Sequence, residues 1–293
     1  MTTELCLDHV GIVVPDLEAA RQAYDRLGFR LTPRSPHEGR LTPDGPVETW
    51  GSGNHCAMFR RGYLELLGIT DPSKHHEHLK ERLGRYQGLQ LVALGCADAA
   101  AVRTRWAGAH HDLRPVAEVS RAVPQAAGGS RPATFRIVYL DDQFPEAMLF
   151  AIEHVDPDAL WQPELLSQPN AVTALRGVTI VSPDPRATAG RLRDLGLDGA
   201  PAAGGWRVPL ALGGWIDLMA PSDVEARFAG ETPPAVPSAI AVTYEVADID
   251  ATARHLVGAD IAFEPGDGCL RVPAKYAQGC VIEFVTPGMG GGA

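Results

Sequence analysis

Acidic side chains recur in the middle of four short apolar runs. The runs are YLELLGI at 63–69, AIEHVDP at 151–157, WIDLMAP at 215–221 and VIEFVTP at 281–287. Their acidic residues are Glu65, Glu153, Asp217 and Glu283. Such apolar runs predict buried strands, and a carboxylate that faces into a cavity can bind a cation or move a proton. The pattern therefore indicates one type of carboxylate position, repeated four times.

Histidines accompany the first two of these positions. His9 lies in the alternating run LDHVGIVV, and His55 lies in the strand expected to precede Glu65. Whether His55 faces the same side as Glu65 depends on a two- or three-residue turn around 60–62. His154 follows Glu153 directly, so the two side chains point to opposite faces of a regular strand. The run KHHEHLK at 74–80 begins a helix, where histidines are more often solvated than bound to metal.

Other chemistries have little support. No nucleophile motif of the GxSxG kind is present, and the glycines at 51–54 lack the lysine and helix of a phosphate-binding loop. The five cysteines are odd in number and lack CxxC spacing, which predicts reduced thiols of a cytoplasmic protein. Nucleotide binding and covalent catalysis are therefore not expected.

An internal repeat organises the chain that must position these side chains. Residues 7–29 align without a gap on residues 175–197, each as a strand, a turn with aspartate and an amphipathic helix that ends in Leu-Gly. Asp16 and Asp184 are the expected N-caps, and Gly28 and Gly196 the expected left-handed residues after the helices. Looser copies begin at Leu89 and Ile240. With the four runs above as final strands, the chain contains four βαβββ units.

Paired units predict the fold class. A four-stranded sheet with one helix leaves one sheet face uncovered, and two such sheets facing each other form a curved, half-closed barrel with a concave face. We expect an α+β protein with two half-barrel domains at 1–155 and 172–293, joined by a surface-packed segment at 156–171. The stretch from Leu113 to Pro132 has no clear period and is expected to be a loop beside the first cup.

Composition limits the partners. The chain has 293 residues, a formal net charge of -10 and 45% hydrophobic residues, which is typical of a folded protein that does not bind nucleic acid. No apolar stretch approaches the roughly 18 to 20 residues that cross a bilayer, and no basic segment opens a signal peptide. We expect a cytoplasmic protein with no membrane partner. A homodimer is one of the assemblies that the sequence allows.

The chain resembles the vicinal oxygen chelate superfamily, and within it the bacterial glyoxalase-like proteins. The resemblance rests on LDHVGIVVPDLEAARQAYDRLGF, on GSGNHCAMFRRGYLELLGI and on the fourfold unit over nearly the whole chain. It implies a cup that holds a divalent metal ion between a first-strand histidine and last-strand carboxylates. It also implies a small oxygenated substrate that chelates this ion.

Carried over to this sequence, the resemblance implies His9, Glu65 and Glu153 as metal ligands, with Glu65 and Glu153 also catalytic and with Asn54 and His55 in contact with substrate. Zn, Ni, Mn or Fe would suit such a site. The first-strand position of the second unit is Leu91, which cannot coordinate a metal, and His154 or His55 could replace the missing ligand. The corresponding positions of units three and four are Gly177 and Ala241, so the second cup lacks histidine.

Two functions of different classes remain open. The first is a metal-dependent lyase or isomerase of glyoxalase type, in which the ion stabilises an enediolate-like charge. The alternative is a metal-free protein that binds or sequesters a small molecule, which Leu91 and the three units without a ligand histidine favour. An extradiol-type dioxygenase is less favoured, because one histidine and two carboxylates fall short of the two-histidine, one-carboxylate triad. In a third reading, the degenerate second half is purely structural or dimerising and supports the first.

Overall fold

The computed structural model describes residues 4–42, 44–109, 113–125, 128–140 and 144–288. The expected βαβββ unit occurs four times. Unit one comprises β1 (Cys6–Val14), α1 (Leu17–Arg26), β2 (Ser35–Arg40), β3 (Val47–Met58) and β4 (Tyr63–Ile69). Unit two comprises β5 (Gly88–Gly95), α3 (Ala99–Ala107), β6 (Ala117–Pro124), β7 (Ser130–Tyr139) and β8 (Met148–His154).

The second half repeats this order with shorter outer strands. Unit three comprises β9 (Val172–Val181), α5 (Pro185–Asp194), β10 (Ala200–Ala202), β11 (Gly205–Pro209) and β12 (Trp215–Met219). Unit four comprises β13 (Ser238–Val246), α7 (Ile249–Gly258), β14 (Glu264–Gly266), β15 (Cys269–Val272) and β16 (Val281–Val285). Between units lie α2 (Glu77–Leu83), α4 (Pro157–Leu160) and α6 (Val224–Arg227).

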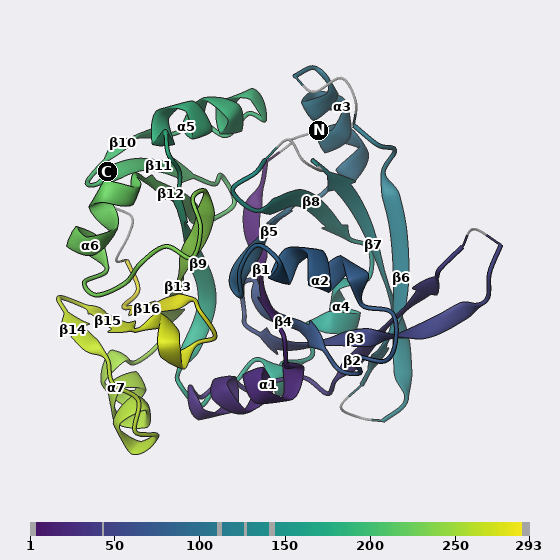
Figure 1. Ribbon diagram of the computed structural model, residues 1–293, viewed down its shortest axis with the longest axis horizontal. Helices are drawn as coiled ribbons and strands as arrows, with labels where there is room; N and C mark the ends of the chain where they lie inside the picture. Colours follow the sequence, from purple (N-terminus) through teal and green to yellow (C-terminus); the bar gives the residue numbers. More distant parts are fainter. Residues whose placement is uncertain (1–3, 43, 110–112, 126–127, 141–143, 289–293) are drawn as a thin grey trace.

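Each half forms one eight-stranded sheet. The orders are β2-β3-β4-β1-β5-β8-β7-β6 and β10-β11-β12-β9-β13-β16-β15-β14, so the first strands of paired units lie side by side at the centre. Within each unit the first and last strands run parallel, with His9 opposite Tyr63 in unit one and Leu91 opposite Met148 in unit two. The protein is therefore α+β with two similar halves, which stand side by side in Figure 1.

The helix ends follow the repeat. Asp16, Asp98, Asp184 and Asp248 each accept a hydrogen bond from a backbone N–H at the start of a helix, at 2.9 to 3.0 Å. Such caps satisfy an otherwise unpaired donor and are worth about 1 kcal/mol each. Gly28 and Gly196 have φ of 83° and 82°, the left-handed conformation that glycine adopts without strain. The expected caps are confirmed.

The helix-bearing faces of the two sheets share one core. Its buried side chains come from both halves, and include Val10, Trp106, Val178 and Tyr244. Trp106 of α3 donates to the carbonyl of Leu195 at the end of α5, at 3.1 Å. The opposite, concave face of each sheet carries a separate apolar cluster. Each half therefore has a cup that points away from the shared core.

The structure corrects the expected loop at 113–132. This stretch contains β6 and the start of β7, paired as a hairpin from Ala117–Ile137 to Pro124–Ser130. β6 is an edge strand whose residues are mostly exposed, so its sequence lacks the apolar alternation of a half-buried strand.

Two further expectations concern the described residues. All five cysteines are free thiols, as their number and spacing indicated. Among the residues that the structure describes, no helix is long and apolar enough to cross a membrane.

Candidate binding site in the N-terminal cup

The concave face of the first sheet, here called the first cup, has an apolar floor. Tyr63, Leu91, Phe135 and Phe150 belong to its buried cluster, together with Cys56 and Met58 of β3. The neighbouring strand residues Leu64 and Leu66 belong to the shared core on the other face. The alternation of β4 therefore turns Tyr63 and Glu65 into the first cup.

His9 lies on this floor, where the sequence placed it. Its ring stacks on Tyr63 with centroids 4.2 Å apart and meets the edge of Phe150 at 5.6 Å. Its Nδ1 lies 2.7 Å from Oδ1 of Asp8. A register shift between Leu7 and His9 marks an irregularity in β1, which brings the consecutive side chains Asp8 and His9 together.

Asp8 also contacts the imidazole of His154. Nε2 of His154 lies 3.1 Å from each carboxylate oxygen of Asp8, and the Asp8 residue is 6% exposed. Burial raises the pKa of Asp8, but the hydrogen bonds from His154 and His9 outweigh it and lower this pKa to about 2. The two histidines of the floor are thus tied to one buried carboxylate.

Glu65 occupies the open side of the first cup. It accepts a hydrogen bond from the amide nitrogen of Asn54 and lies opposite Cys56 across the strand pair. Arg121 lies on β6, the strand at the far edge of the sheet. Its Nη1 donates to Ser35 of β2, the strand at the other edge, at 3.1 Å. This contact joins the two edge strands, so the half-barrel is closed by a guanidinium at the side of the cup.

A second polar group lies beside Glu65. Nδ1 of His37 is 2.9 Å from Oγ of Ser52, which in turn is 3.3 Å from Nε2 of His78. The indole of Trp50 covers His78, with ring centroids 5.1 Å apart. Burial lowers the pKa of both histidines, and the positive charge of neighbouring histidines helps to lower that of His78 to about 4. Both imidazoles are therefore neutral at pH 7.

A cavity of about 190 Å³ opens between the two edges of the sheet. Its wall is mainly apolar, with Cys56, Met58 and Val123 on the strands and Leu160 and Leu165 on the segment that follows β8. Arg121, Ser35, Thr32 and Gln125 supply polar atoms at its border. A cavity of this kind suits a small molecule with an apolar body and a polar or negatively charged end.

The connecting segment closes one end of the cup. Ala159 and Leu160 of α4 belong to the apolar cluster of the cup, and Trp161 donates to the carbonyl of Phe59 at 3.0 Å. The amide of Gln168 donates to the carbonyl of Met58 at 2.8 Å. The segment that the sequence placed along the surface is therefore also part of the cup wall.

Glu153 does not join His9 and Glu65, which corrects the expected ligand set. It faces the other side of β8, where it accepts hydrogen bonds from Nη1 of Arg136 and from the backbone nitrogen of Ala99, both at 2.9 Å. In the register of the parallel strands, the residue of unit two that corresponds to Glu65 is Phe150. In the run AIEHVDP the acidic residue therefore lies three positions after the site that the acidic residue takes in the other three runs.

His55 is also directed away from the cup. It lies opposite Leu66, a residue of the shared core, and its Nδ1 is 2.7 Å from the carbonyl oxygen of Thr32. The turn after β3 has two central residues and is closed by the hydrogen bond from Phe59 N to Gly62 O at 3.1 Å, which settles the side. Asn54, the other expected contact of the substrate, does face the cup beside Glu65.

Sequence reasoning missed Arg121, His37, Ser52 and His78. Arg121 lies on β6, where the sequence predicts a loop, and His78 belongs to the histidine-rich run that is expected to be solvated. The alternation of Ser52 with Asn54 in front of Glu65 was the available signal, because residues two apart on a strand share a face.

The residues of the first cup do not fit a divalent metal ion. Such an ion needs three or four protein donors, and the two positions of unit two that correspond to His9 and Glu65 hold Leu91 and Phe150. Within the described residues, no group of three or more His, Cys, Asp and Glu side chains could hold a metal ion. One polar atom of each of these two residues is also engaged within the chain, Nδ1 of His9 by Asp8 and Oε1 of Glu65 by Asn54.

Comparison with known proteins assigns the family. The model of the glyoxalase-like domain matches residues 7–196. The chain belongs to the glyoxalase-like domain family. Its resemblance to the vicinal oxygen chelate superfamily is thereby confirmed, and solved structures agree with it. No curated protein matches the sequence.

Three solved structures share the fold at low identity. A hypothetical protein from Staphylococcus aureus has a TM-score of 0.66 and 13% identity, over 96% of this chain and 99% of its own. A variant of 4-hydroxymandelate synthase from Streptomyces coelicolor has a TM-score of 0.56 and 13% identity, and the match covers 97% of this chain and 93% of the synthase. The Mn(II)-bound glyoxalase from Novosphingobium aromaticivorans has a TM-score of 0.54 and 13% identity, and the match covers 97% of this chain and 82% of the glyoxalase. At this identity the likeness establishes the fold of the glyoxalase-like chain.

Proposed function

We propose that the first cup binds a small organic molecule with an apolar body and a polar or acidic end, without a divalent metal ion. The observation that carries this proposal is the pair Leu91 and Phe150, which stands where unit two would have to supply its ligands. The cavity between the edge strands supports it, because its apolar wall ends at the guanidinium of Arg121. The metal-dependent lyase or isomerase is accordingly the weaker of the two functions.

Arg121 would orient the ligand. A guanidinium attracts a carboxylate or sulfonate, and hydrogen bonds to a charged group are stronger than those between neutral groups. Asn54 and Glu65 would contact a polar group on the open side of the cup, because they are the polar pair that faces it from the first unit. The apolar body would lie against Met58 and Val123.

Fluorescence titration with anilinonaphthalene sulfonate, an aromatic probe with one negative charge, tests the proposal. We expect saturable binding that is unchanged by excess EDTA. Arg121→Met should weaken binding about tenfold, because it removes one charged hydrogen bond worth about 1.5 kcal/mol. Val123→Phe should weaken it by filling the cavity.

Arg131→Met is the matched control, since Arg131 is exposed on the same hairpin, outside the cavity lining. Thermal unfolding of each variant separates lost binding from lost structure. Binding that disappears with EDTA and returns with Mn²⁺ or Zn²⁺ would contradict the metal-free proposal. Binding that neither Arg121→Met nor Val123→Phe changes would contradict the position of the site.

The two half-barrel domains at 1–155 and 172–293 are part of the proposal, as is a cytoplasmic location. The homodimer stays a prediction.

A further inference from the structure

The cup of the second half contains two buried carboxylates at corresponding positions. Asp217 lies two residues after the partner of Gly177, and Glu283 lies two residues after the partner of Ala241. Glu65 has the same relation to His9 in unit one. Asp217 and Glu283 are 4% and 6% exposed. Two buried negative charges on one concave face repel each other and require a cation.

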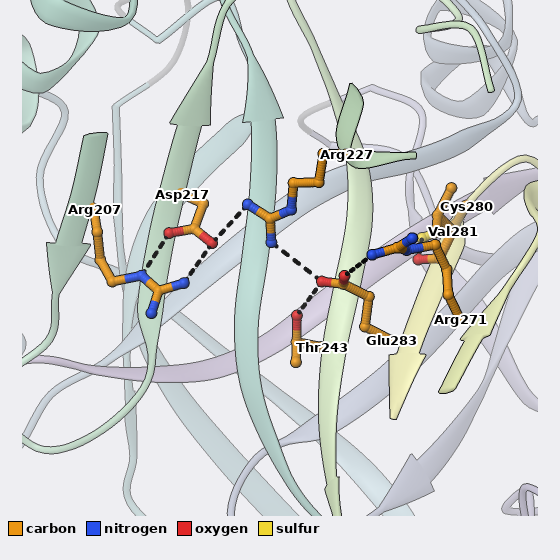
Figure 2. A network of polar contacts seen from close by, with 8 residues as sticks. All are labelled: Arg207, Asp217, Arg227, Thr243, Arg271, Cys280, Val281 and Glu283. Carbon is orange, nitrogen blue, oxygen red and sulfur yellow. Dashed lines mark hydrogen bonds and ion pairs between the residues drawn. The ribbon is translucent and has the colours of Figure 1, made fainter. Parts of the chain in front are cut away.

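A guanidinium lies between these carboxylates. Nη1 of Arg227 donates to Oδ2 of Asp217 at 3.1 Å, and Nη2 donates to Oε2 of Glu283 at 3.2 Å. Figure 2 shows the guanidinium of Arg227 between the carboxylates of Asp217 and Glu283. Burial lowers the pKa of Arg227, but the charges of Glu283 and Asp217 outweigh it and raise this pKa. Arg227 therefore keeps its charge inside the cup.

Each carboxylate has in addition an arginine on its neighbouring strand. Arg207 forms two hydrogen bonds to Asp217, at 2.7 and 2.8 Å, and Arg271 contacts Glu283 at 3.3 Å. In the first cup the corresponding neighbour of Glu65 is Cys56, which carries no positive charge. The two carboxylates of the second cup thus face three guanidinium groups, while Glu65 has no cation at the matching position of its neighbouring strand.

The helix that carries Arg227 also fills the apolar part of the second cup. Val224 and the fully buried Phe228 pack with Ala241 and Val281 on the floor. The indole of Trp215 covers Gly177, where a Cβ atom would overlap it. A ligand would have to displace both α6 and this indole.

We propose that the guanidinium of Arg227 occupies a cation position between Asp217 and Glu283, so that the floor of the second cup is filled by the chain itself and takes no metal ion. α6 delivers this cation and the apolar side chain next to it. The second half is then a scaffold whose inner charges are balanced without a metal ion.

Substitution of Arg227 in the full chain tests the proposal, with Mn²⁺ alone as the probe. Arg227→Ala should lower the Tm by about 10 °C, because each buried carboxylate then keeps one arginine in place of two and the two carboxylates lose the cation between them. It should also bind about one Mn²⁺ more than the unchanged protein, measured by electron paramagnetic resonance of free Mn²⁺. Asp217→Asn combined with Arg227→Ala should lose this extra ion.

The controls separate charge from shape. Arg254→Ala removes an exposed arginine of α7 and should change neither quantity. An Arg227→Ala protein with unchanged Tm, or a less stable one without extra Mn²⁺, would overturn the proposal. If Arg227→Ala does not fold, Arg227→Lys should fold and Arg227→Met should not. Equal behaviour of Lys and Met would assign the position to shape and likewise overturn it.

Discussion

Asp8 connects two histidines on the floor of the first cup, and neither was recognised as its partner from the sequence. A regular strand would point Asp8 and His9 to opposite faces, and only the register shift in β1 brings them together. Irregularities of this kind depend on pairing with other strands, so the local sequence does not reveal them.

The protonation of Asp8 should destabilise the protein in acid. The pKa of Asp8 falls from its ordinary 3.8 to about 2, so its stabilising effect is complete above pH 4 and is lost as the pH falls to 2. We expect a loss of about 2 kcal/mol in the free energy of unfolding over this range. Urea unfolding at several pH values measures it.

Asp8→Asn should reduce this acid-dependent loss, since the amide does not titrate. The control is Asp158→Asn, which removes an exposed carboxylate of α4. A slope between pH 4 and 2 that is the same in Asp8→Asn and in the unchanged protein would speak against the hydrogen bonds from His9 and His154 as its cause.

At the same scale, Glu65 could be predicted and Glu153 could not. The position of Glu65 follows from strand alternation next to a tight turn, which local sequence encodes. Glu153 looked equivalent because the run around it resembles the others. Only the pairing of β5 with β8 shows that Phe150 takes the carboxylate position.

Among the elements, the short segment after β8 contributes directly to the wall of the first cup. α4 inserts Leu160 into the apolar cluster of the cup, and the next residue, Trp161, lies against the rings of His154 and Tyr63, at 4.9 and 5.9 Å. The sequence indicated a packed connection through its tryptophan and prolines. It did not indicate that the connection forms a wall of the cavity, because that depends on the curvature of the sheet.

Trp161→Ala should therefore affect binding as well as stability. The loss of the indole contacts and of the hydrogen bond to Phe59 should lower the free energy of unfolding by about 3 kcal/mol. We also expect weaker binding of anilinonaphthalene sulfonate, measured by the titration described above. Trp161→Phe keeps most of the ring contacts and should retain most of both. Unchanged binding in Trp161→Ala would remove α4 from the site.

The edge strand β6 illustrates what element prediction missed. Central strands such as β1 and β9 are buried on both faces and have long apolar runs, which predict strands correctly. β6 pairs with β7 alone along its length and is mostly exposed, so little in its composition distinguishes it from a loop. Arg121 was missed with it.

For the whole molecule, the repeat made the fold predictable, but it left open how the halves meet. Tyr24 of α1 donates to the carbonyl of Ala277 at 3.1 Å, and Phe29 meets the rings of Tyr244 and Phe284. The family match ends at Gly196, directly after α5, and thus includes the contact of Trp106 with Leu195. Both halves contribute to one interior.

A fragment of residues 1–171 should therefore not fold as the intact protein does. Removal of the second half exposes Tyr24, Phe29 and Trp106, which are at most 1% exposed in the full chain. We expect aggregation or a broad, uncooperative thermal transition, observed by circular dichroism and size-exclusion chromatography. The full chain should show a cooperative transition. A monomeric fragment with a sharp transition would refute the dependence on the shared core.

The filling of the second cup by α6 and Phe228 has a consequence for engineering. α6 is four residues long and lies in the connection from β12 to β13, two strands that pair with other strands of the same sheet. The corresponding connection of the first half contains α2, and the cavity of the first cup stays accessible beside it. Grafting that longer connection in place of α6, together with a smaller residue at Trp215, would open a second binding cavity within a single polypeptide.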